Sequence, residues 1–286
     1  MEEKAEVKKV KGRRKYGPGE VIVFIILVIL AILILYPMFW ILMSSFKDYT
    51  SIYTDVWGLP EVWHVENYIN AWNRGISQYF VNSLIVTAAT LIGVVFIASF
   101  AAFGVCQIKG KLGNVIFMIC LCGLLLAPQV CVLPLFMILK ALGLKNTLWA
   151  MILPYIAFRL PISIMMLRAF FMGISKELEE AAIIDGASMF QIYSHIYLPL
   201  SKPILSTVTI MTIYYAWNEF MFATIFVDSS KLRTIPVGLM VFRDGLMTDW
   251  GVVMAGMVIS CVPILILFLL MQKSFVRGMT AGAVKG

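Results

Sequence analysis

Two charged residues stand inside runs that are otherwise apolar, and they are the first candidates for chemistry. Arg159 lies near the middle of the run 147–171, and Glu219 is the only acidic residue inside any of these runs. A charge at the centre of a bilayer costs roughly 2.5–3.5 kcal/mol on insertion scales, so each side chain should face protein or water and have a partner. A direct contact between the two is one hypothesis. In the alternative, each faces a separate water-filled cavity or a partner subunit.

The segment around Glu219 is the most polar and aromatic part of any apolar run. Its sequence is Tyr214-Tyr215-Ala216-Trp217-Asn218-Glu219-Phe220. Aromatic faces with a few hydrogen-bonding groups suit a sugar ring, and Asn218 could bond sugar hydroxyls. The candidates for lining a polar pathway through the membrane are therefore Arg159, Tyr214, Trp217, Asn218 and Glu219. Packing against another membrane subunit is the alternative for the aromatic side chains.

A second polar stretch, 180–203, separates two apolar runs and carries the signals of two short helices. The first helix is predicted over 175–185, where an acidic first turn suits the helix dipole. Gly186 suits the left-handed position that follows a helix, because it has no Cβ to clash. Ser188 can then cap a second helix through a capping box with Gln191. Two prolines should end that helix before the next apolar run, namely Pro199 and Pro203.

This stretch resembles the cytoplasmic EAA signature of the membrane permease subunits of ABC importers. The matching residues are Glu180-Ala181-Ala182, Asp185-Gly186-Ala187 and Ile196-x-Leu198-Pro199, with the family's spacing between the glycine and the isoleucine. In that family the loop forms a coupling helix that docks in a cleft on an ATPase subunit. The resemblance implies docking through Glu180, Ala181, Ala182, Asp185, Gly186 and Ala187, where small residues permit close approach and the acids make charged contacts. A loop helix without a partner is the alternative.

Three further strings resemble the carbohydrate-uptake branch of these importers, in particular the smaller permease of the maltose type. They are Trp217-Asn218-Glu219-Phe220, the loop 232–239 and the tail 277–286. The resemblance implies a homologous second permease, an ABC ATPase dimer that holds ATP and Mg, an extracytoplasmic solute-binding protein, and a sugar or oligosaccharide substrate. It also implies a C-terminal tail that enters the interface between the ATPases. A disordered terminus is the alternative.

The composition is that of an integral membrane protein. Of 286 residues, 61% are hydrophobic and 14% are charged, whereas soluble proteins carry about 25% charge. The net charge of +7 does not require a nucleic acid, because seven of the 23 basic residues lie in 4–15, before the first apolar run. Positive charge at that position anchors the cytoplasmic side. The cysteines fall in apolar segments without ligand spacing, so we expect free thiols and no metal site.

We predict an all-α fold with six membrane spans, at 21–43 and about 81–108, 114–139, 147–171, 204–227 and 252–271. By the resemblance this is the type I ABC importer permease fold with a cytoplasmic coupling helix. The expected organisation is a basic tail (1–19), a six-span domain (20–273) that includes the coupling loop 172–203, and a C-terminal tail (274–286). Pairs of prolines occur in the third and fourth spans, where they either break helices along the pathway or only adjust packing.

The basic residues also set the orientation. With the N-terminus inside, basic residues on the inner side outnumber those on the outer side by about two to one. This places both termini and the loop 172–203 in the cytoplasm. The expected location is the inner membrane of a bacterial or archaeal cell.

The energy for transport is expected to come from a partner. The chain has no G-x-x-x-x-G-K-[ST] sequence, so it should not bind or hydrolyse ATP and is not expected to be an enzyme or to hold a cofactor. The same machinery importing glycerol phosphate or another small polar solute is an alternative. A proton-coupled secondary transporter with Arg159 and Glu219 as a relay is another, but it leaves the EAA loop unexplained.

Overall fold

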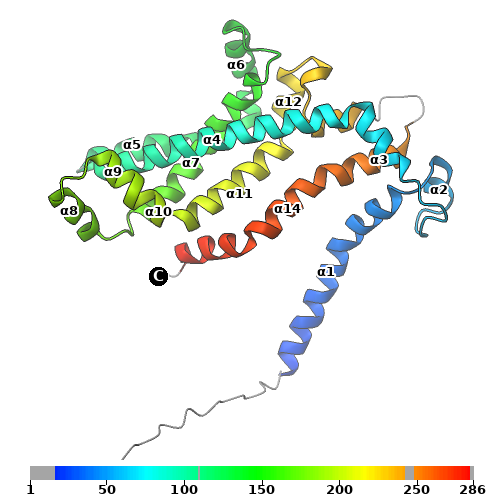
Figure 1. Cartoon of the computed structure of the whole chain (residues 1–286), viewed down its shortest axis with the longest axis horizontal. Coiled ribbons are helices and arrows are strands. Elements are labelled where there is room, and N and C mark those ends of the chain that lie inside the picture. The colour runs from blue at the N-terminus through cyan, green and yellow to red at the C-terminus, as the bar shows by residue number, and fades with distance from the viewer. Residues whose placement is uncertain (1–16, 109, 242–247, 284–286) are drawn as a thin grey trace, which may run out of the picture.

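The computed structural model describes residues 17–108, 110–241 and 248–283, and the regular structure in these ranges is entirely helical (Figure 1). The predicted all-α class is confirmed. The α-helices are α1 (Pro18–Ser44), α2 (Tyr49–Thr54), α3 (Glu66–Ala71), α4 (Ser77–Gln107), α5 (Lys111–Cys122), α6 (Pro128–Ala141), α7 (Trp149–Phe171), α8 (Lys176–Ile184), α9 (Met189–Ile192), α10 (Leu198–Leu200), α11 (Lys202–Asn218), α12 (Met221–Phe226), α13 (Ile235–Val241) and α14 (Trp250–Ala283).

Long apolar helices form the body of the molecule. Helices α4, α7, α11 and α14 pack side by side, whereas α1 touches this bundle chiefly at α14 and then diverges from it (Figure 1). Within the described ranges four helices are individually long and apolar enough to cross a membrane, and two bent pairs raise the number to six at most. The apolar side chains of α1 are exposed along its length, as lipid or a neighbouring subunit would require.

The third and fifth predicted spans are not straight helices. Helices α5 and α6 meet at an angle of 99°, because Pro128 starts α6 and restricts Ala127 before it to an extended conformation. Helix α11 ends at Asn218, and Glu219 is extended before α12 begins. The spans predicted over 114–139 and 204–227 are therefore broken helices, and in the third span the break lies at one of its two prolines.

The last helix is longer than the sixth predicted span. Helix α14 continues to Ala283, so residues 274–283 of the predicted C-terminal tail are helical. Most of the basic N-terminal tail and residues 284–286 lie outside the described residues.

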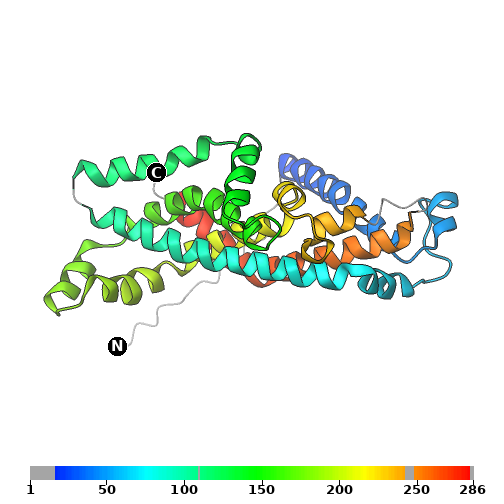
Figure 2. The same ribbon diagram turned by 90° about the horizontal axis from the view of Figure 1, so that it is seen from above.

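The two ends of the bundle carry different segments. Helices α2 and α3 lie at one end, and α8 and α9 project from the other, as both views show (Figures 1 and 2). The Asn67 amide fixes the first end by donating to the carbonyls of Ser45 (3.0 Å) and Lys47 (2.9 Å). Because Gly251 has no side chain, α14 can pack closely against the same turn. A Cβ at this position would lie 2.5 Å from the Lys47 carbonyl oxygen. The segment 47–78 and the loop 172–203 therefore lie at opposite ends of the bundle.

Candidate functional site

The coupling loop folds as its local sequence signals predict. Ser175 caps α8 by accepting a hydrogen bond from the Glu177 N–H. Beyond the helix, Gly186 has a φ of +80°, and its N–H bonds to the Ile183 carbonyl while the Ala187 N–H bonds to the Ala182 carbonyl. These two bonds form a Schellman motif, which needs a left-handed residue at its centre. The glycine is thus required by backbone conformation.

The second helix of the loop also begins as predicted. Ser188 and Gln191 form the capping box: the Ser188 hydroxyl accepts from the Gln191 N–H, and the Gln191 side chain accepts from the Ser188 N–H. The helix then continues through a π-helical turn, Tyr193–Tyr197, into α10. As predicted, the two prolines lie on either side of the end of this helix. The helix ends at Leu200, and α11 leaves at 78° with Pro203 in its first turn.

The six predicted docking residues divide between an outer and an inner face. Ala182 and Ala187 are half-buried and pack against the core at this end of the bundle. The other four are exposed: Glu180, Ala181, Asp185 and Gly186. Beside them Ile184 is 85% exposed, and Met189 and Phe190 are exposed as well. Composition alone did not single out these three apolar residues, although their place around the glycine turn is a usable signal.

Two tyrosines fasten the loop to the bundle. The Tyr193 hydroxyl shares a hydrogen bond of 2.7 Å with Ser99 on α4. The Tyr197 hydroxyl donates to the Glu179 carboxylate on α8 at 2.7 Å, and its ring packs between Phe103 and Phe171. Burial first, and then this hydrogen bond, raises the pKa of Tyr197 above its ordinary value. The phenol therefore stays protonated as a donor, and these contacts link α8 to α4 and α7.

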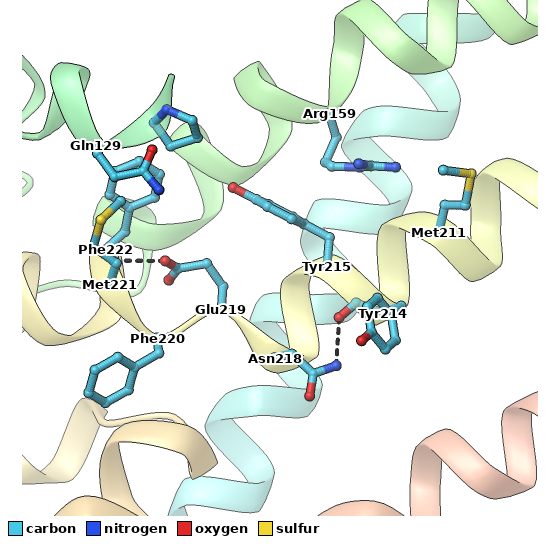
Figure 3. Close-up of a pocket in the computed structure, with 11 residues that line it drawn as sticks. Gln129, Arg159, Met211, Tyr214, Tyr215, Asn218, Glu219, Phe220, Met221 and Phe222 are labelled. Atoms are coloured by element: carbon cyan, nitrogen blue, oxygen red, sulfur yellow. Dashed lines mark hydrogen bonds between the residues drawn. The ribbon is translucent and has the colours of Figure 1, made fainter. Parts of the chain in front are cut away.

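A cavity of about 570 Å³ opens between α7, α11 and the break before α12 (Figure 3). Four of the five predicted pathway residues line it: Arg159, Tyr214, Asn218 and Glu219. Sequence reasoning did not select Tyr215 and Gln129, which line it too. Tyr214 and Asn218 share one face of α11 because they are four residues apart.

Trp217 does not line the cavity, so the prediction that it is a pathway residue is wrong. Its side chain is 4% exposed, its indole N–H donates to the Ser260 carbonyl at 3.1 Å, and Phe80 meets its ring edge-on. One residue turns a helix by about 100°, so Trp217 points toward α14 and α4 and not toward the cavity. It packs α11 into the bundle.

Glu219 acts on the backbone at the helix break. Its carboxylate accepts from the N–H groups of Phe222 (2.8 Å) and Ala223 (3.2 Å), and from the Tyr155 hydroxyl. A carboxylate at the start of a helix satisfies unpaired N–H groups and complements the helix dipole. Glu219 therefore stabilises the start of α12 beside the cavity. Tyr155 was missed by sequence reasoning.

The hypothesis of a direct Arg159–Glu219 contact fails in this structure. No salt bridge of Arg159 occurs within the described ranges. Its guanidinium carbon lies 5.4 Å from the centre of the Tyr215 ring, and its buried Nε has no hydrogen-bond partner. Figure 3 shows Arg159 reaching from α7 toward Tyr215 and Met211 on α11. The cavity thus contains a cation that has no ionic contact among the described residues.

The part of the chain that matches a known family includes both the EAA loop and the cavity. Residues 93–281 match the family described as "Binding-protein-dependent transport system inner membrane component". The chain belongs to this family. It is therefore a multi-pass membrane permease subunit of a transport system.

Relatives cover nearly the whole permease. It is 53% identical over 278 residues to the probable ABC transporter permease protein YurM of Bacillus subtilis (strain 168), covering 97% of this chain and 93% of that protein. It is 37% identical over 268 residues to the trehalose/maltose transport system permease protein MalG of Thermococcus litoralis, covering 91% and 94%. In fold it resembles a chain of a bacterial ABC transporter involved in the import of the acidic polysaccharide alginate, with a TM-score of 0.79 at 23% identity over 91% and 99% of the two chains.

Proposed function

We propose that this permease forms one half of the translocation pathway for a sugar or oligosaccharide in an ATP-driven importer. A separate ATPase dimer binds ATP and Mg and hydrolyses the nucleotide, and it couples to the permease through the loop 172–203. A homologous second permease supplies the other half of the pathway, and an extracytoplasmic solute-binding protein delivers the substrate. Both termini lie in the cytoplasm.

The exposed turn between α8 and α9 is the observation that carries this proposal. Ile184 and Phe190 expose apolar side chains beside the acidic groups of Glu180 and Asp185. A contiguous apolar patch within a polar rim is typical of a protein interface. An added Cβ at Gly186 would meet no atom of this chain within 4 Å, so a partner can approach the backbone closely at this point.

The mechanism is alternating access. When the ATPase pair closes, it moves α8, and the Tyr197–Glu179 and Tyr193–Ser99 hydrogen bonds carry the movement to the long helices. The pathway then changes between states that open to opposite sides of the membrane. The solute and the solute-binding protein shift this equilibrium only as far as their affinities for the two states differ.

The sugar assignment rests on the cavity and on the relatives. Tyr214 and Tyr215 provide ring faces, and Asn218 provides a hydrogen-bonding group, which together suit a polyhydroxylated ring. Named relatives include permeases for trehalose/maltose, for diacetylchitobiose and for melibiose/raffinose/stachyose. The alternative of a proton relay from Arg159 to Glu219 lacks a direct contact between the two side chains.

The decisive experiment is co-purification through a tag on this chain in mild detergent, with mass identification of the bound chains and an ATPase assay. We expect a second permease and an ATPase. In the complex, Gly186→Val should release the ATPase or uncouple hydrolysis from uptake, while the permease still inserts.

Gly143→Val is the matched control. Gly143 also has a positive φ (+68°), and an added Cβ there also meets nothing within 4 Å, but it lies on the connection between α6 and α7, outside the EAA loop. Its substitution should cause comparable backbone strain and leave the ATPase attached. Equal loss of the ATPase in both variants would remove the docking argument, and proton-driven transport by the isolated chain would replace the importer proposal.

A further inference from the structure

We infer that Arg159 is an anion-binding residue of the cavity, and that the imported solute is an acidic sugar carrying one carboxylate- or phosphate-type group. This inference rests on the proposed function and narrows its substrate class. The starting observation is the state of the guanidinium. Arg159 lines the cavity, and its buried Nε has no hydrogen-bond partner.

Among the described residues, no carboxylate is in contact with Arg159. Glu219, the other charged residue of the cavity, is already bound to the Tyr155 hydroxyl and to two backbone N–H groups at the start of α12. The Tyr215 ring separates the two charged side chains in Figure 3. A ring face orients a guanidinium by cation–π attraction but carries no net charge. The positive charge therefore has no counter-ion among the described residues, and in this inference the ligand supplies one.

The chemistry of arginine selects the class of ligand. A guanidinium presents a planar fork of donors that matches the two oxygens of a carboxylate or a phosphate. A neutral sugar hydroxyl accepts only one such donor and leaves the charge uncompensated in a membrane-embedded site, which is unfavourable. Burying the charge beside an anionic group removes that cost.

The remaining polar groups can bind the uncharged part of the same molecule. The Asn218 amide nitrogen donates to the Tyr214 carbonyl at 2.8 Å, which leaves the amide oxygen free to accept from a sugar hydroxyl. Tyr214 and Asn218 are exposed, on the α11 face that borders the cavity. Glu219 repels an anion from its own end of the cavity, so the acidic group is directed to Arg159 and the hydroxyls to α11.

The test first identifies the solute and then removes the charge. Cells with and without this gene grow in a medium of yeast and plant-wall hydrolysates, and mass spectrometry finds the compounds that only the intact strain depletes. The depleted compounds should be sugars with one acidic group. Arg159→Gln should raise the apparent KM for their uptake on the order of 10- to 100-fold, the cost of losing one charge-assisted pair. Arg159→Lys should raise the KM less, because lysine keeps the positive charge but lacks the planar fork of donors.

Controls keep the outcomes distinct. Lys140→Gln removes an exposed charge at the end of α6, outside the cavity, and should not change uptake. Co-purification of the ATPase with Arg159→Gln shows that this variant is assembled. If the intact strain depletes a neutral sugar, the inference is overturned and the proposed function stays intact. The same holds if cells with Arg159→Gln take up the acidic sugar with an unchanged KM. Depletion of a solute without a sugar ring, or equal media from both strains, overturns the proposed function itself.

Discussion

Tyr155 on α7 donates a hydrogen bond to Glu219, which lies at the break between α11 and α12. The same carboxylate accepts two N–H groups from the first turn of α12. One acidic side chain therefore joins α7 to the point where the fifth predicted span changes direction. Because the break borders the cavity, its geometry helps to set the shape of the cavity.

Removing the charge at this break should destabilise the permease and slow transport. Glu219→Gln weakens the acceptor for the α12 N–H groups and for the Tyr155 hydroxyl, and we expect a loss of about 1–3 kcal/mol of stability. Tyr155→Phe should cost about 1 kcal/mol, and the double variant should cost less than the sum of both, because the two residues share one contact. Thermal unfolding in detergent measures all three variants.

The control for these three variants is Tyr214→Phe. Tyr214 is exposed, and its hydroxyl has no hydrogen bond within the described part of the chain. It should leave the thermal transition unchanged while it weakens solute uptake. Additive effects of the Tyr155 and Glu219 substitutions would show that their contact does not stabilise the break.

The sequence was sufficient wherever neighbouring residues decide the structure. The left-handed Gly186 and the capping box of Ser188 each depend on groups within a few positions, and both are found. Trp217 shows the limit of this reasoning. Its place between α11 and α14 depends on how two distant segments pack, and no local pattern distinguishes it from the cavity-lining Asn218 beside it.

The helix breaks mark a second limit. An apolar run gives the length of a span but not its direction, so 114–139 met the requirement for a span although α5 and α6 are bent by 99°. Pro128 signalled a possible bend, but the angle depends on tertiary packing. Arg159 shows the same limit, since its contact with Tyr215 requires the antiparallel packing of α7 and α11.

The hydrogen bond from Tyr197 to Glu179 should determine how efficiently ATP hydrolysis drives uptake. Tyr197→Phe keeps the packed ring and removes only the tie between α8 and the second helix of the loop. We expect the ATPase to remain bound, since the exposed turn is untouched, while the number of ATP molecules hydrolysed per imported solute rises several-fold. Parallel assays of hydrolysis and uptake in proteoliposomes measure this ratio.

Tyr53→Phe serves as the comparison for Tyr197→Phe. Tyr53 is exposed on α2, at the opposite end of the bundle, so its substitution should leave the ratio unchanged. Release of the ATPase by Tyr197→Phe would mean that the bond shapes the docking surface. An unchanged ratio would mean that the movement reaches the bundle without this bond.

The aromatic residues after α2 should lie against the outer surface of the bilayer. Trp57 is 74% exposed and stacks on Tyr36 of α1 with ring centres 6.0 Å apart, and the Trp40 indole donates to the Val56 carbonyl at 2.8 Å. The segment therefore folds back alongside the last turns of α1, whose apolar side chains are exposed. Tryptophan favours the headgroup level, where its ring is half in hydrocarbon and half in water.

Quenching by brominated lipids tests this placement. In vesicles brominated near the headgroups, Trp57→Phe should remove a large part of the quenchable tryptophan fluorescence. Trp217→Phe is the matched control, because Trp217 is 4% exposed and lies inside the bundle, so its loss should leave the quenchable part unchanged. If the fluorescence of Trp57→Phe is quenched as much as that of the parent protein, this segment faces water or a partner. Quenching that disappears only when the solute-binding protein is added would indicate that the same aromatic surface receives that protein.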